Sequence, residues 1–172
     1  MLHHEKVSHD RLFSYHNQHL YHKENKLHRN FMGYTTNTNK ILIGLGVSSI
    51  SDGWSAYSQN EKALKTYLEK VNKGEFPTIK GYQLTAKDLV AKQHILDIIC
   101  QHRTVVNGVN KDVMTNALPR LKELELDGLL TVGEDGIVLS DSGKTFVRNV
   151  CMAFDHHMFD RNPDVPMFSS SV

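Results

Sequence analysis

A chain of 172 residues can form one ordinary domain, or a small domain with an extended arm, but not two full catalytic domains. Its 20 Lys and Arg residues nearly balance 19 Asp and Glu, and a formal net charge of +1 gives no general attraction to nucleic acid or anionic membranes. The longest apolar run, residues 41–47, is too short to cross a bilayer. The sequence therefore predicts a cytoplasmic globular protein with no nucleic-acid and no membrane partner.

The first thirty residues are polar and hold seven of the eleven histidines, which predicts a helical or irregular arm. Four of these histidines recur at or near helical spacing, so that two imidazoles could share one face for zinc or nickel: His16, His19, His22 and His28. A specific metal site needs a third or fourth fixed ligand with supporting neighbours, and the surrounding residues are typical of a solvated face. The same holds for His156 and His157. We therefore predict no metal site.

Residues 41–47 are apolar and suit a strand buried on both faces. No second buried strand is evident before Ala86, so the sequence predicts that the partners of this strand are missing and that the domain is truncated. Residues 57–67 have a helical pattern. Gly74 and Pro77 end it before an extended connector over residues 78–84.

A compact domain is predicted from residue 85 to residue 158. Thr85 can cap a helix whose apolar positions recur at helical spacing, and a second helix is predicted from near Asn116, with Pro119 in its first turn, to Gly128. Two β-rich runs around four turn-forming residues, 133–136, predict a hairpin. Ser140 or Ser142 begins a last helix. The predicted core comprises Ile95, Ile99, Leu121, Leu124, Val147, Val150 and Phe154.

Helices, a hairpin and a closing helix outline a winged-helix-like domain, which raises as the alternative function a stand-alone interaction or DNA-binding module. The helix before the hairpin, however, carries Arg120 and Lys122 against three acidic residues, and the hairpin tip is acidic too. Both would repel phosphate. The two cysteines, Cys100 and Cys151, lie in apolar helical patterns that favour buried free thiols over a disulfide, and two cysteines cannot hold an iron–sulfur cluster.

Two segments carry a specific resemblance. Residues 28–36 have the pattern HRNF-x-GYTT, and residues 44–51 have G-x-G-V-S-x-I-S. Further matches follow in order at residues 57–60, 81–84, 98–100, 127–129 and 147–155. Together, over residues 19–158, the chain resembles the C-terminal part of oxygen-independent coproporphyrinogen III oxidases. Met32 departs from the pattern, because many members have Gln there.

The resemblance implies a radical S-adenosylmethionine enzyme of haem biosynthesis, which oxidatively decarboxylates coproporphyrinogen III to protoporphyrinogen IX using a 4Fe–4S cluster. The cluster loop of the family, C-x-x-x-C-x-x-C, is absent from this sequence. The resemblance further implies that Ile50 and, with a weaker match, Phe31 contact S-adenosylmethionine in the full-length enzyme. From the residues alone, both could be ordinary core positions.

The resulting expectation is an α+β, mostly helical chain in four parts: residues 1–55, the edge of a truncated barrel with a polar arm; residues 56–84, a helix and connector; residues 85–158, the winged-helix-like domain; and residues 159–172, a disordered tail. We expect a fragment with no catalytic residue and no cofactor of its own. Its expected partners are the missing N-terminal barrel and, in the full enzyme, coproporphyrinogen III, whose site the C-terminal domain would help to close.

Overall fold

The computed structural model describes residues 26–31, 33–106 and 111–160. The chain forms two compact units, which divide between Leu89 and Val90. The predictions for the N-terminal arm with His16, His19 and His22, and for the tail beyond residue 160, lie outside the described residues. Among the helices that the structure describes, none is both long enough and apolar enough to cross a membrane.

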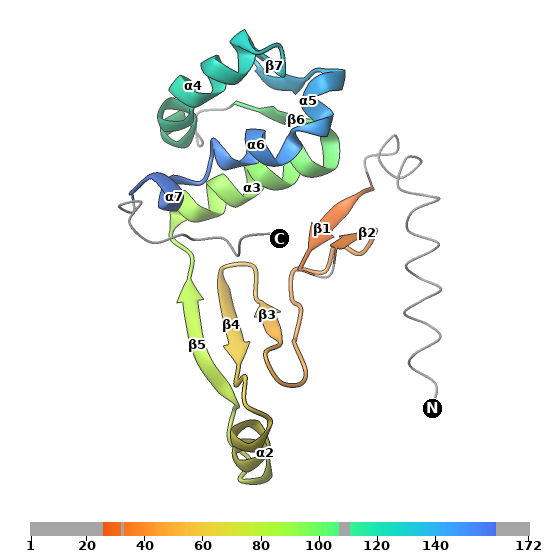
Figure 1. Cartoon of the computed structure of the whole chain (residues 1–172), viewed down its shortest axis with the longest axis vertical. Helices are drawn as coiled ribbons and strands as arrows, with labels where there is room; N and C mark the ends of the chain where they lie inside the picture. The colour runs from red at the N-terminus through yellow and green to blue at the C-terminus, as the bar shows by residue number, and fades with distance from the viewer. Residues whose placement is uncertain (1–25, 32, 107–110, 161–172) are drawn as a thin grey trace, which may run out of the picture. The chain divides into compact units, whose positions relative to one another are not determined.

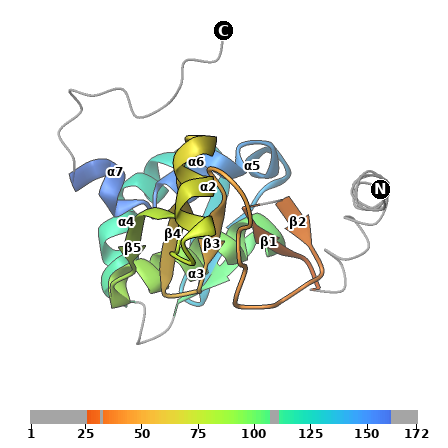
Figure 2. The same cartoon turned by 90° about the horizontal axis from the view of Figure 1, so that it is seen from below.

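The first unit contains two small antiparallel sheets (Figures 1 and 2). A two-stranded ribbon is made by β1 (His28–Asn30) and β2 (Gly33–Thr35). The larger sheet has the order β3-β4-β5. Its strands, with the helix α2 that connects β4 to β5, are β3 (Ile50–Asp52), β4 (Ala56–Asn60), α2 (Leu64–Asn72) and β5 (Thr78–Gln83).

Two predictions for this unit are wrong. Residues 41–47 are not a buried strand: only Leu42 forms a bridge, to Asp52, while Ile43 and Leu45 are 72% and 85% exposed. The predicted helix over residues 57–67 begins only at Leu64, because residues 57–59 pair with both neighbouring strands of the sheet. Cross-strand hydrogen bonds to β3 and β5 outweigh the local helical pattern there. The predicted extended connector is confirmed as β5.

The second unit is built from most of α3 and everything after it. Its elements are α3 (Ala86–Gln101), β6 (Arg103–Val105), α4 (Lys111–Leu126), β7 (Leu130–Gly133), β8 (Gly136–Leu139), α5 (Asp141–Thr145), α6 (Val147–Met152) and α7 (His156–Asp160). The predicted hairpin is confirmed as β7 and β8, and β6 adds to β8 in the order β6-β8-β7. In Figure 1, α6 lies beside α3. Described as a whole, the chain has mixed helices and small antiparallel sheets.

Two helix ends in the second unit were predicted correctly from local sequence. The side-chain hydroxyl of Ser140 accepts a hydrogen bond from the Gly143 amide at the start of α5. Gly128 has a φ of +72°, a conformation that glycine adopts without strain, just after α4. The start of α4 was predicted wrongly. It begins at Lys111, and Pro119 lies inside it, because the first turns bury Val113, Met114 and Ala117. The predicted last helix is interrupted at Phe146.

The predicted core is confirmed as one cluster. Leu121, Val150 and Phe154 are fully buried, and the other four predicted residues pack against them as partly buried side chains. Cys100 and Cys151 are buried free thiols, as expected. Arg120 of α4 donates two hydrogen bonds, from Nε and Nη2, to the Ala153 carbonyl at 3.0 and 2.8 Å. This side chain therefore ties α4 to the end of α6.

Candidate cofactor-facing surface

Ile50, the first of the two residues expected near S-adenosylmethionine, is the first residue of β3. It is half-buried and pairs with Gln59 of β4, and Asp52 pairs with Tyr57. Directly opposed residues in an antiparallel sheet point to the same face, as do residues two apart along a strand. Ile50, Gln59 and Tyr57 therefore share one face of the sheet.

Phe31, the second expected residue, follows β1 and reaches that same face. Its ring contacts Tyr57 edge to face, with centroids 5.3 Å apart and planes at 83°, which is a favourable aromatic geometry. The side chain remains 53% exposed. The structure thus brings Phe31 to the Tyr57 and Ile50 face, although 18 residues separate Phe31 from Ile50 along the chain. Met32 lies outside the described residues.

The glycines that precede β3 are required by the local backbone geometry. A Cβ placed on Gly44 would lie 2.6 Å from the carbonyl oxygen of Ile50, far inside van der Waals contact. Gly44 is therefore needed because the backbone of Ile50 lies against it. Gly46 has a φ of +102°, which side-chain-bearing residues rarely adopt.

Gly44→Ala is expected to destabilise the first unit by about 1–3 kcal/mol, because the new methyl group must displace the Ile50 backbone. Faster amide hydrogen exchange across β3 and β4 would report the loss. Gly53→Ala is the matched control, since a Cβ at Gly53 meets its nearest atom, the Ala56 carbonyl oxygen, at an ordinary 3.6 Å. Unchanged exchange in Gly44→Ala, or equal effects of the two substitutions, would contradict this account.

A buried polar group in the second unit was missed by sequence reasoning. His94 of α3 is only 2% exposed, and its Nδ1 lies 2.7 Å from the Thr104 hydroxyl oxygen. The Thr104 hydroxyl donates to Asp97, so that its oxygen accepts from Nδ1–H of His94. Nε2 is then the unprotonated nitrogen, and it has no hydrogen-bond partner among the described residues. Its ring stacks on Phe154 with centroids 5.0 Å apart.

The environment of His94 favours the neutral imidazole. Burial lowers the pKa of His94 below its usual value, and the nearby Asp97 carboxylate opposes that shift in part. Protonation at Nε2 would create a buried N–H donor with no acceptor. His94 therefore acts as a core side chain that resists protonation. Only its place on the apolar face of a predicted helix could have signalled this role.

Asp88 is another buried polar residue, and its part is to begin α3. Its Oδ2 accepts hydrogen bonds from the Thr85 amide and hydroxyl at 2.8 Å and from the Tyr82 hydroxyl at 3.2 Å. The Thr85 hydroxyl in return accepts from the Asp88 amide, which completes a reciprocal capping box. This confirms Thr85 as the predicted cap.

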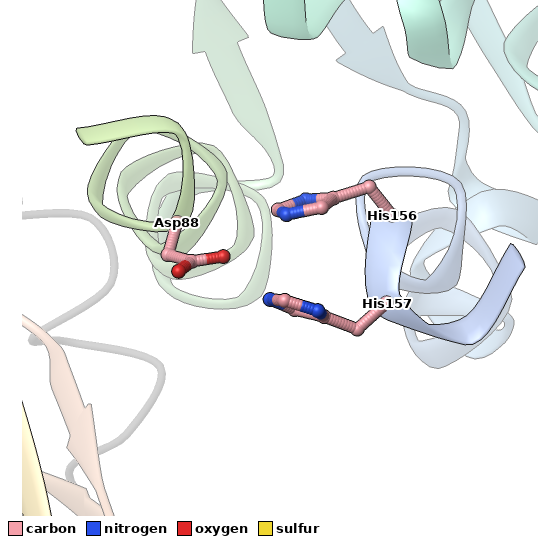
Figure 3. A group of neighbouring side chains, drawn as sticks. All are labelled: Asp88, His156 and His157. Carbon is pink, nitrogen blue, oxygen red and sulfur yellow. The ribbon is translucent and has the colours of Figure 1, made fainter. Parts of the chain in front are cut away.

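Figure 3 draws Asp88 with His156 and His157 of α7. Asp88 belongs to the first unit and the two histidines belong to the second. The rings of His156 and His157 lie 4.2 Å apart between centroids. The absence of a metal site stays a prediction.

Comparison with known proteins gives one consistent relationship. A protein of Escherichia coli (strain K12) named oxygen-independent coproporphyrinogen III oxidase is 36% identical over 143 residues, which cover 79% of this chain and 31% of that protein. A protein of the same name from Synechocystis is 30% identical over 161 residues, 87% of this chain and 34% of that protein. No protein-family model matches the chain.

The fold comparison agrees with the sequence comparison. The solved structure of HemN from Escherichia coli, a coproporphyrinogen III oxidase described as a radical SAM enzyme, matches with a TM-score of 0.75 and 35% identity. The match covers 81% of this chain and 34% of that one. The resemblance noted in the sequence is therefore confirmed, and the chain spans about a third of the length of the relatives it matches.

Proposed function

We propose that this chain, a relative of oxygen-independent coproporphyrinogen III oxidases over about a third of their length, is the C-terminal part of such an enzyme. The complete enzyme would convert coproporphyrinogen III to protoporphyrinogen IX by oxidative decarboxylation, in the cytoplasm, within haem biosynthesis. The observation that carries the proposal is the agreement of sequence identity and fold over about four fifths of this chain.

Residues of this chain suit contact with S-adenosylmethionine, but they do not suit ligation of the 4Fe–4S cluster. Ile50 and Phe31 present apolar side chains over one sheet face, which suits a flat group such as adenine. The 4Fe–4S cluster would supply the electron that cleaves S-adenosylmethionine. Its ligands would come from elsewhere in the enzyme, because Cys100 and Cys151 are both buried and no third cysteine exists. This chain would therefore contribute to holding S-adenosylmethionine, with Ile50 and Phe31 as the contacting residues.

The partner we propose is the N-terminal radical S-adenosylmethionine barrel. An alternating row of apolar side chains before β3 is exposed: Ile41, Ile43, Leu45 and Val47. Such a row is costly to leave in water and is typical of a surface covered by another part of the protein. The length of the relatives, about three times the part matched here, provides a segment large enough to cover it.

For the second unit we propose a winged-helix-like arrangement that packs beside the barrel and helps to close the substrate site. Supporting it are two helices, a β6-β8-β7 sheet with its hairpin, and the short helices that follow. DNA binding has no observation in its favour. The Arg120 guanidinium donates to the Ala153 carbonyl rather than extending from α4 as a phosphate contact.

The test is anaerobic cluster reconstitution followed by detection of 5′-deoxyadenosine. We expect none from this chain above a no-protein control, because it has only two cysteines. We expect cleavage when the chain replaces the matching third of the Escherichia coli relative in a full-length fusion. Cleavage by the chain alone would overturn the fragment proposal. A fusion that folds and holds its cluster but cleaves no S-adenosylmethionine would contradict the assigned function.

A further inference from the structure

The conformation of the segment that leads into Ile50 is unusual. Ser48 has a φ of +60°, which is uncommon for a residue with a side chain, and Gly46 also has a positive φ. In residues that carry a side chain, such as Ser48, positive-φ conformations cost roughly 1–3 kcal/mol and persist only where the surroundings fix them. They are often found where a protein holds a ligand. Hydrogen bonds from several neighbouring groups fix residues 44–49 in this conformation.

Most of the fixing groups come from the end of β4. The Asn60 side-chain amide donates from Nδ2 to the carbonyl oxygens of both Gly44 and Gly46, at 3.1 and 3.0 Å. Asn60 is 8% exposed. Gln59 donates from Nε2 to the Ser48 carbonyl at 3.2 Å. These two adjacent amide side chains therefore hold three carbonyls of the strained segment.

Other contacts also hold the segment, among them one from the Gly44 amide to the Ser51 hydroxyl oxygen at 3.0 Å. The Asn60 backbone amide donates to the Ser49 carbonyl at 2.9 Å, and the Ser48 amide donates to the Glu61 carbonyl at 2.8 Å. From α2, the Tyr67 hydroxyl oxygen accepts from the Gly46 amide at 3.2 Å. Asn60 is the buried residue among these that reaches two carbonyls with one side chain.

The segment in turn positions Ile50. The Ile50 carbonyl lies against Gly44, so closely that no side chain fits between them. Ile50 also pairs with Gln59, the neighbour of Asn60. A shift of the Gly44 backbone would therefore be transmitted directly to the backbone of Ile50.

We infer that Asn60 is a positioning residue for S-adenosylmethionine: its amide fixes the 44–49 segment against which Ile50 is placed. This inference rests on the proposed contact of Ile50 with that cofactor. Asn60 itself touches backbone and not cofactor. Asn60 is also the last residue of the 57–60 motif, for which the sequence showed only a match to the family.

The first experiment uses the 172-residue chain with no cofactor. Asn60→Ala and Asn60→Asp each remove the two donated hydrogen bonds, so the amides of Gly44 and Gly46 should exchange faster with solvent. Ser58→Ala is the matched control on the same strand, since Ser58 is half-buried and takes no part in holding the segment. Unchanged exchange in both Asn60 variants would overturn the inference at its structural step.

The second experiment measures equilibrium binding of S-adenosylmethionine to the full-length fusion with its reconstituted cluster. Both Asn60 variants should weaken binding about tenfold relative to the unsubstituted fusion, the effect of losing roughly one net hydrogen bond. A buried carboxyl has a raised pKa, and its protonated form can donate one hydrogen bond again. Asn60→Asp, but not Asn60→Ala, should therefore regain affinity relative to the unsubstituted fusion as the pH falls from about 8 to about 6.

The outcomes separate the two proposals. If the unsubstituted fusion does not bind S-adenosylmethionine, the proposed function fails. If it binds, and the Asn60 variants bind equally well or Asn60→Asp shows no recovery at lower pH, the positioning role of Asn60 is wrong. A general loss of folding would also speed amide exchange in α2 and β5, so faster exchange confined to residues 44–49, together with recovery of Asn60→Asp at lower pH, supports the inference.

Discussion

Phe154→Ala is expected to lower the free energy of unfolding of the second unit by about 3–5 kcal/mol, the cost of removing a fully buried aromatic ring and leaving a cavity. Phe154 is 1% exposed, belongs to the main core cluster and stacks on His94. A loss of this size is a large part of the stability of a small domain. Denaturant unfolding followed by circular dichroism would measure it.

Phe146→Ala is the control of the same residue type, because Phe146 lies between α5 and α6 and is 50% exposed. It should cost much less. Ile50→Ala should also leave the unfolding of the second unit nearly unchanged, since Ile50 belongs to the first unit and not to this cluster. If Ile50→Ala destabilises the second unit as much as Phe154→Ala does, the assignment of Ile50 to the cofactor surface loses its main support.

Acidification is expected to destabilise the second unit through His94. The folded state lowers the pKa of His94, so the unfolded chain binds a proton more readily than the folded one. The stabilisation is complete above the unfolded pKa, about 6.5, and is lost as the pH falls below it towards the lowered folded value. For one proton the loss is at most about 1.4 kcal/mol per pH unit. Denaturant unfolding at several pH values between 8 and 5 would record it.

His94→Gln removes the titrating group while keeping an amide that can bond to Thr104. The variant should be less stable than the parent chain at pH 8, and its stability should fall less between pH 7 and pH 5. Every other histidine is common to both proteins, so the difference between the two pH profiles isolates His94. Identical slopes would show that His94 does not remain neutral in the folded unit.

Sequence signals succeeded where a few neighbouring residues decide the outcome. Thr85 and Ser140 begin helices because their hydroxyls accept from amides three residues ahead. Gly128 follows α4 because glycine tolerates a positive φ. The hairpin of β7 and β8 and the core around Phe154 were predictable because alternation and helical spacing place apolar residues on one face.

Ile50 and Phe31 were found only through their resemblance to a family, because apolar residues in a buried strand are usually core. The structure adds that both residues reach one sheet face, through the pairing of β3 with β4 and the contact of Phe31 with Tyr57. No pattern of neighbouring residues indicates either the pairing of β3 with β4 or the contact of Phe31 with Tyr57.

The sequence by itself determined the ends of several elements, the composition of the second unit's core and the family that the chain resembles. Only the tertiary structure decided that residues 57–60 form a strand, that Gly44 must be small and that the Asn60 amide holds the segment before Ile50. The physical reason is the same in each case. These properties depend on hydrogen bonds and close approaches between residues distant in the chain, and local spacing does not encode which groups will meet.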